Sequence, residues 1–211
     1  MDEEAAWHGY CYVNSIVCMN GDGAELLDRY THLLRTDVDT FITPAWNDFH
    51  PTGFTCGIGG YSNDDEVRQR IQEIAARYGL VHGGLTNVGS TWYGPTEVVR
   101  RASAFAEMLM KHILAHYFAT DEGEWPGWYR GVTLLYAGEI AVNYCAPDAQ
   151  QSALLDAGST SQESVSRCAT STAKRRHRST VAIVPQEDET GRMGVYVRPY
   201  PGLGATRASR D

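Results

Sequence analysis

The chain has 211 residues and a formal net charge of −8, with 43% hydrophobic and 21% charged residues. This length and composition favour one core-forming domain with appendages and exclude a chain that is disordered throughout. There is no run of ~18 apolar residues and no basic segment followed by an apolar run near the N-terminus, so we expect a cytoplasmic protein with no membrane partner.

The charge is unevenly distributed along the chain. Residues 1–165 carry 22 acidic and nine basic side chains, a net charge of −13, whereas residues 166–211 carry four and nine, a net charge of +5. An acidic body attracts basic proteins and repels phosphates, and a basic tail does the reverse. Alternatively, these charges only keep the protein soluble.

The first 53 residues contain a predicted strand, a predicted helix and a long loop. Alternating Tyr, Val and Ile predict the strand at 10–18, and an apolar stripe predicts the helix at 24–35. Residues 36–53 show neither the strand period of two nor the helical period of 3.6 residues. This aromatic segment, which contains Trp46 and His50, is expected either to cap the core or to form a binding loop.

Residues 54–85 read as a strand, a helix and a second strand. The glycine-rich stretch 54–60 predicts the first strand, and an apolar period predicts the helix at about 62–78, which Gly79 ends. The second strand is expected at 80–85. This order predicts a β-α-β arrangement.

The longest helical pattern covers about 95–118. Its apolar residues recur at helical spacing, and Pro95 suits the first turn because its missing N–H has no helical partner there. His112 and His116, one turn apart, lie along the edge of the apolar face. The pattern therefore predicts the central packing helix of the domain.

An acidic, aromatic loop with Trp125, Trp128 and Tyr129 follows this helix. Residues 131–145 then read as a hairpin with its turn near Gly138. The predicted fold class is therefore α+β, a mostly antiparallel sheet of four to five strands packed by three helices, the longest at about 95–118.

Three regions are expected along the chain: an acidic α+β domain at 1–146, a linker at 147–180 and a terminal β-hairpin with a tail at 181–211. Eleven of the 34 residues in the linker are Ser or Thr, and none is Phe, Trp or Tyr. The linker ends in a basic cluster that could contact phosphates, formed by Lys174, Arg175, Arg176 and Arg178.

His112 and His116 have the i, i+4 spacing by which a helix offers two imidazoles to one metal ion. The zincin pattern also needs Glu directly after the first His, and this sequence has Ile113. A third ligand would have to come from elsewhere, such as His50, His82, Glu107, Asp121 or a cysteine. The alternative is a pair of histidines at the edge of the core, hydrogen-bonded to loop carbonyls.

Three short motifs share an order with a known family: Trp7-His8-Gly9-Tyr10 at the first expected strand, Gly60-Tyr61-Ser62-Asn63 after the next, and Tyr78-Gly79-Leu80 closing the helix. Over residues 7–85 the chain resembles one group of bacterial polymorphic-toxin immunity proteins. The resemblance implies a small α+β protein that binds and blocks a toxin, with no catalytic residue. The helix at 95–118 departs from that pattern, as do the missing His after Asn63 and the missing acidic stretch after the third strand.

We therefore expect a non-enzymatic protein-binding or inhibitor protein, in its specific form an immunity protein that neutralises a basic toxin, with no cofactor. Large aromatic residues dominate interface energies, so the expected binding residues are Trp46, His50, Trp125, Trp128 and Tyr129; alternatively the tryptophans complete the core. Two other functions stay open. One is a metal-dependent enzyme with a divalent ion at His112 and His116, and the other is a nucleic-acid-associated or virion component acting through residues 174–178.

Overall fold

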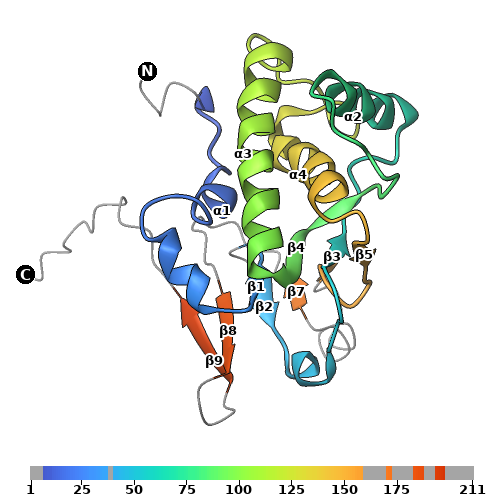
Figure 1. The fold of residues 1–211 in the computed structure, drawn as a ribbon. Coiled ribbons are helices and arrows are strands. Elements are labelled where there is room, and N and C mark those ends of the chain that lie inside the picture. The colour runs from blue at the N-terminus through green and yellow to red at the C-terminus, as the bar shows by residue number, and fades with distance from the viewer. Residues whose placement is uncertain (1–6, 38–39, 159–169, 173–182, 188–192, 198–211) are drawn as a thin grey trace, which may run out of the picture.

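The computed structural model of the protein describes residues 7–37, 40–158, 170–172, 183–187 and 193–197. A six-stranded sheet in the order β5-β3-β4-β1-β8-β9 forms its centre (Figure 1). All neighbouring strands in it are antiparallel except β3 and β5. The strands are β1 (His32–Arg35), β3 (Thr55–Ile58), β4 (Val88–Pro95), β5 (Gln150–Gln151), β8 (Ile183–Glu187) and β9 (Met193–Val197).

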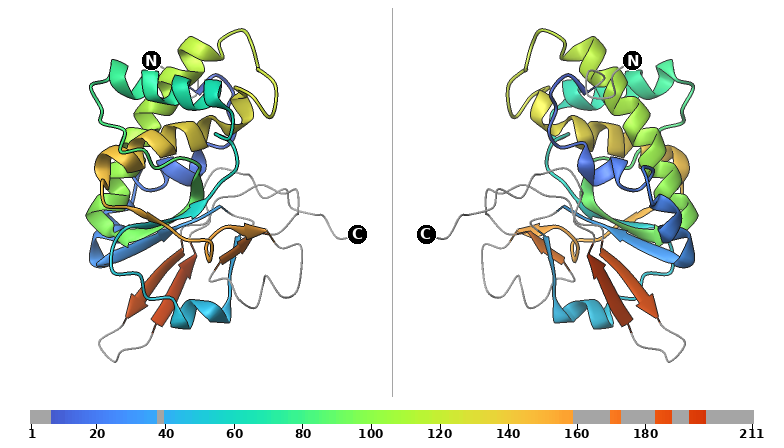
Figure 2. Two further views of the ribbon diagram at one scale, coloured as in Figure 1. Left: turned by 90° about the vertical axis from the view of Figure 1, so that its right-hand side faces the viewer. Right: turned by 90° about the vertical axis from the view of Figure 1, so that its left-hand side faces the viewer.

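The α-helices cover one face of this sheet (Figure 2). The main core lies between the two layers and contains Leu33, Cys56 and Trp92 from the strands. The α-helices are α1 (Asn14–Val17), α2 (Asp65–Arg77), α3 (Thr96–Tyr117) and α4 (Thr133–Cys145), and the 3-10 helices are η2 (Ala24–Arg29), η3 (Pro44–Asp48) and η4 (Arg130–Val132). No helix in the described part of the chain is long and apolar enough to cross a membrane.

A smaller core lies against the other face of the sheet. Leu34 and Tyr93 from the strands pack there with Trp46, Phe49 and Leu155. A second sheet has the order β2-β7-β6, formed by β2 (Thr40–Ile42), β7 (Thr170–Thr172) and β6 (Ala157–Gly158). The predicted α+β class with a mostly antiparallel sheet is confirmed.

The two amphipathic helices form close to where the sequence predicts them. In α3, Val99, Ala106 and Ile113 are completely buried. At the start of α2, the Asp64 carboxylate accepts hydrogen bonds from two backbone N–H groups of the first turn, which cap the helix. Gly79 follows α2 with a φ of 66°, a left-handed conformation that favours glycine.

The strand predicted at 10–18 is wrong. Residues 7–13 form turns, and α1 follows them. The buried residues Tyr10, Ile16 and Met19 do not alternate as a strand requires. The backbone carbonyl and hydroxyl of Ser15 both accept hydrogen bonds from Arg35, so long-range contacts decide the conformation here.

Two further predictions of secondary structure are wrong. The helix predicted at 24–35 is the short helix η2 followed by strand β1, so Leu33 and Leu34 point to opposite faces of the sheet. Residues 80–85 form a loop instead of a strand, and β4 starts at Val88. The side-chain amide of Asn143 satisfies the backbone N–H and carbonyl of Leu85, in place of a neighbouring strand.

The hairpin predicted at 131–145 is helix α4. Nearly every residue of α4 is buried, so the sequence lacks the polar face by which amphipathic helices are recognised. Gly138 is not a turn residue. A Cβ at this position would lie 2.8 Å from the Trp92 ring, so glycine lets the helix approach the sheet.

The boundary predicted at residue 146 is also wrong, because residues 147–158 belong to the folded body. Strand β5 pairs with β3, and Leu155 is buried. The predicted terminal hairpin is present as β8 and β9, and β8 pairs with β1. Of the rest of the predicted linker, residues 170–172 form β7, whereas residues 159–169 and 173–180 lie outside the described residues, as does the tail at 198–211.

Candidate functional site

The predicted aromatic binding residues do not form one surface. Trp46 is buried in the smaller core, where it contacts Phe49 and Tyr93. Trp128 stacks on Tyr136, with ring centroids 4.2 Å apart, and therefore also packs against the core. Of the predicted anchors, Trp125 has half of its surface exposed. Helix η3, which contains Trp46, and the loop after α3 lie at opposite ends of the molecule (Figure 1).

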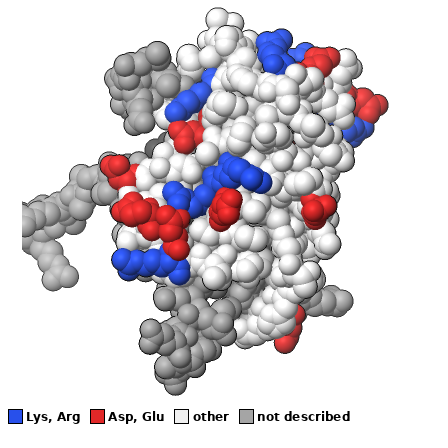
Figure 3. Space-filling model, in the orientation of Figure 1, with Lys and Arg blue, Asp and Glu red and all other residues white. Residues whose placement is uncertain are grey.

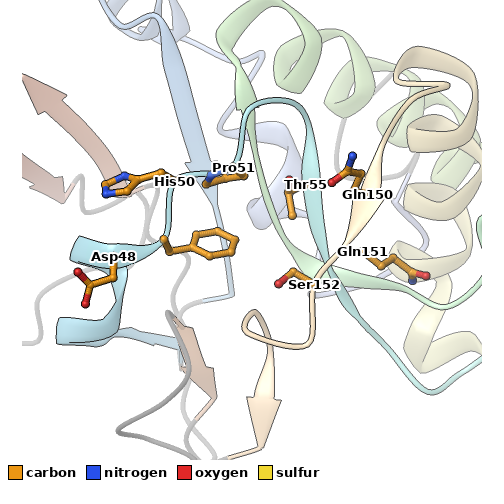
Figure 4. A pocket seen from close by; sticks show the side chains of 8 residues that line it. Asp48, His50, Pro51, Thr55, Gln150, Gln151 and Ser152 are labelled. Carbon is orange, nitrogen blue, oxygen red and sulfur yellow. The ribbon is translucent and has the colours of Figure 1, made fainter.

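His50 lines an open groove of about 270 Å³ beside strand β5. Figure 4 shows Asp48 and His50 on one side of the groove and Gln150, Gln151 and Ser152 on the other. The remaining lining residues are Phe49, Pro51 and Thr55. Hydroxyl, amide and imidazole side chains thus dominate the groove, which suits a polar ligand.

The acidic residues do not form one continuous patch on the face of the molecule shown in Figure 3. Acidic and basic side chains lie side by side there. A broad part of the same face carries no charged residue.

His112 and His116 lie together on α3, with ring centroids 4.3 Å apart. Tyr78 packs edge-on against His112, and burial lowers the pKa of His112 below its ordinary value, with smaller contributions from His116 and Arg77. No group of three or more His, Cys, Asp or Glu is placed to hold a metal ion in the described part of the chain. The basic cluster at 174–178 lies outside that part.

A buried polar network joins α4 to the connections on either side of α2. The Glu139 carboxylate accepts hydrogen bonds from the Tyr61 hydroxyl at 2.9 Å, the Ser62 hydroxyl at 3.2 Å and the Asn87 backbone N–H at 2.7 Å. His82 Nε2 lies 3.4 Å from the same carboxylate. Because Glu139, Tyr61 and Ser62 are all buried, we interpret this network as structural.

The second polar cluster lies at the end of strand β1, in the middle of the large sheet. Arg35, the last residue of β1, is 1% exposed, and its guanidinium lies 4.6 Å from the centre of the Trp92 ring. It donates hydrogen bonds to Ser15 and to the Ser90 backbone carbonyl. Asp37 Oδ1 lies 3.7 Å from the guanidinium, with 39% of the Asp37 side chain exposed. One charged residue of this cluster therefore reaches solvent.

Asp156 brings a second carboxylate to this cluster. It accepts hydrogen bonds from the Thr91 backbone N–H at 2.9 Å, from the Thr91 hydroxyl and from the Ser90 hydroxyl at 3.3 Å. A Cβ at Gly57 or at Gly89 would overlap this carboxylate. Two strands thus carry glycine where the Asp156 side chain lies.

The backbone of Asp156 is strained. Its φ is 57°, a left-handed conformation that only a few per cent of residues other than glycine adopt. Such strain persists where surrounding contacts impose it, and it concentrates at functional sites. Burial raises the pKa of Asp156, and the nearby Asp37 carboxylate adds to this, while Thr91 and Arg35 oppose it.

Asp37 and Asp156 are linked through two threonines. Thr36 Oγ1 and Thr91 Oγ1 lie 3.0 Å apart, so the residue before Asp37 contacts the residue that binds Asp156. We call Arg35, Asp37, Ser90, Thr91 and Asp156 the carboxylate centre. It combines two carboxylates, a buried guanidinium and a strained backbone at the end of a central strand.

The carboxylate centre is not among the sites predicted from the sequence. One signal was present: Asp37 and Asp39 are separated by one residue and directly follow the apolar end of β1, and residues i and i+2 of an extended chain share a side. Residue 39 itself lies outside the described residues. Asp156 had no such signal, because it lies in a segment whose composition resembles a linker.

Comparison with known proteins yields a family without an assigned activity. The model of a domain of unknown function (DUF7164) matches residues 1–170. No curated protein matches the sequence. The resemblance to immunity proteins therefore remains a prediction, and residues 7–10, which it places at the start of a strand, form a turn.

Proposed function

The chain belongs to the DUF7164 family, and since that family has no assigned activity, we propose from the geometry that it is a metal-dependent enzyme whose divalent ion is bound by Asp37 and Asp156. The observation that carries this proposal is the strained Asp156. Its carboxylate lies over two glycines and binds Thr91, whose hydroxyl contacts Thr36, the neighbour of Asp37.

The electrostatics of the centre favour a cation. Two carboxylates that share a site repel each other, which is part of the reason that the pKa of Asp156 is raised. Arg35, which also pairs with Asp37 at 3.7 Å, offsets this repulsion only in part, since its single positive charge faces two carboxylates. A divalent ion between the carboxylates would remove the repulsion and stabilise both in the ionised form.

The type of ligand indicates the type of ion. Carboxylate oxygens are the preferred ligands of hard cations such as Mg²⁺ and Mn²⁺, whereas paired histidines suit zinc. An ion held by only one or two carboxylates retains positions for water and for substrate oxygens, those of phosphate groups above all. We therefore place the ion at the carboxylate centre instead of at His112 and His116.

We propose that the polar groove binds the substrate. The segment that forms one wall continues from Ser152 to Asp156. Its amide and hydroxyl groups can bind hydroxyl groups of a substrate, while the ion binds an oxyanion. The proposed substrate class is thus a polar molecule that carries a phosphate group.

Titration of the protein with Mn²⁺ tests the proposal. We expect one saturable site in the wild type and an affinity at least about tenfold lower in Asp37→Asn and in Asp156→Asn. Asp65→Asn, at an exposed residue in the first turn of α2, is the matched control and is expected to bind as the wild type does. Asp37 is partly exposed, so its variant remains informative even if Asp156→Asn does not fold. The absence of a saturable site, or wild-type affinity in a folded Asp37→Asn, would contradict the proposal.

A further inference from the structure

Trp125 is the most exposed of the five tryptophans, and it lies on a loop that the rest of the protein braces. The loop, residues 119–130, runs from the end of α3 to the first residue of η4. We call it the Trp125 loop. A half-exposed indole offers a partner a large apolar ring with a π-face, and its surroundings indicate which kind of partner would fit it.

Backbone contacts hold the two sides of the Trp125 loop together. Gly123 and Tyr129 form an antiparallel bridge, and the Arg130 N–H donates to the Glu122 carbonyl at 2.8 Å. The Asp121 carboxylate accepts a hydrogen bond from the Gly123 N–H at 3.0 Å. The loop therefore presents Trp125 from an ordered backbone, which lowers the entropic cost of binding.

Packed aromatic residues support the loop from beneath. Trp128 stacks on Tyr136 at an interplanar angle of 7°, and the Tyr136 hydroxyl donates to the Gly127 carbonyl at 3.2 Å and accepts from the Tyr129 N–H at 3.1 Å. Trp128 thus packs against the core, while the side chain of Trp125, three residues earlier, is exposed and can contact a partner.

Acidic residues outnumber basic ones in the Trp125 loop, and the nearby Arg70 lies over the ring of Trp128. Asp121, Glu122 and Glu124 are all exposed, and the one basic residue of the loop, Arg130, pairs with Glu122 at 3.1 Å. Asp121 and Glu124 form no ion pair with any residue in the described ranges. An aromatic face next to unpaired carboxylates complements a cation, because the ring attracts it through its π-system and the carboxylates through their charge.

We propose that the Trp125 loop is a docking site for a Lys- or Arg-rich segment of a partner protein, with a cationic side chain stacked on the Trp125 indole. The site is separate from the carboxylate centre and does not depend on the metal-dependent function. Opposite charge steers the encounter, and the aromatic anchor provides most of the affinity.

A pair of peptides tests this site in the full-length protein. Hexa-arginine is expected to bind saturably at low salt, and a hexa-citrulline peptide, which has the same shape without charge, at least about tenfold more weakly. Trp125→Ala is expected to lower the affinity for hexa-arginine about tenfold or more, and Trp125→Phe less, because the phenyl ring retains a π-face.

Matched charge variants locate the site. Glu124→Gln and Glu97→Gln remove the same charge, but Glu97 lies in the first turn of α3, at the end of that helix distant from the loop. We expect Glu124→Gln to weaken binding and Glu97→Gln to leave it within about twofold. Equal effects of the two variants, unchanged binding by a folded Trp125→Ala, or no saturable binding of hexa-arginine would overturn the proposal.

Discussion

The Asp156 carboxylate accepts a hydrogen bond from the backbone N–H of Thr91 at 2.9 Å, across 65 positions of sequence. This contact ties the segment after β5 to the middle of β4. The Asp156 side chain fits there because Gly57 and Gly89 have no side chains. The same contact therefore links the stability of the fold to the proposed metal site.

Gly57→Ala is expected to destabilise the protein by about 1–3 kcal/mol, because the new methyl group overlaps the Asp156 carboxylate. Urea unfolding measures the change. Gly60→Ala is the control, since an added Cβ there has no neighbour within 4 Å, and its effect should stay within about 0.5 kcal/mol. Adding Asp156→Gly to Gly57→Ala should cost less than the sum of the single changes. Additive costs would show that the two residues do not interact.

Arg35→Met is expected to lower the free energy of unfolding by about 3 kcal/mol. The substitution leaves the buried Ser15 groups and the Ser90 carbonyl without their donor. Arg35→Lys should also be destabilising, because an ammonium group cannot reproduce the planar fork. Arg77→Met, on an exposed position of α2, serves as control and should change stability by less than about 0.5 kcal/mol. A stable Arg35→Met would mean that the guanidinium is dispensable for folding.

Cys56 is expected to resist alkylation in the native state. Burial raises the pKa of its thiol to about 12, with a smaller contribution from Asp156, so almost no thiolate forms near neutral pH. Cys11 is exposed and should react first. Peptide mapping after brief treatment with iodoacetamide compares the two cysteines. Modification of Cys56 as fast as Cys11 would contradict the packing described for β3.

The protein should lose stability as the pH is lowered through the histidine range, and part of this loss should depend on His112. Its pKa is lowered in the folded protein, so the unfolded chain takes up the proton first as the pH falls below about 6.5. The stabilising contribution is thus present above that pH and is lost as the pH falls toward the folded pKa. Urea unfolding on either side of this window should show a smaller loss for His112→Gln than for the wild type. An equal loss would mean that other groups cause the pH dependence.

The sequence predicted those elements whose pattern is local. Helices α2 and α3 could be predicted because each has one polar and one apolar face. Strand β3 and the terminal hairpin could be predicted because turn residues lie at their ends. Helix α4 was missed because it is buried on nearly all sides, which removes the helical period. Its glycine, Gly138, resembled a turn residue, although its role is to make room for Trp92.

The carboxylate centre could not be predicted for a related reason. Its members are joined by contacts between residues 35 and 90 and between residues 91 and 156, and no local pattern reports such pairs. The histidine pair on α3 was visible in the sequence because its spacing is local. The spacing did not indicate which residues pack against this pair, and in the structure the rings of Tyr78 and Tyr117 contact His112.

Anomalous diffraction from crystals grown with MnCl₂ locates the bound ion and so decides whether Asp37 and Asp156 hold it. We expect a peak within about 2.0–2.6 Å of carboxylate oxygens of both residues. A peak bound by His112 and His116 instead, or no peak beside Asp37 and Asp156 at saturating Mn²⁺, would contradict the proposed metal site.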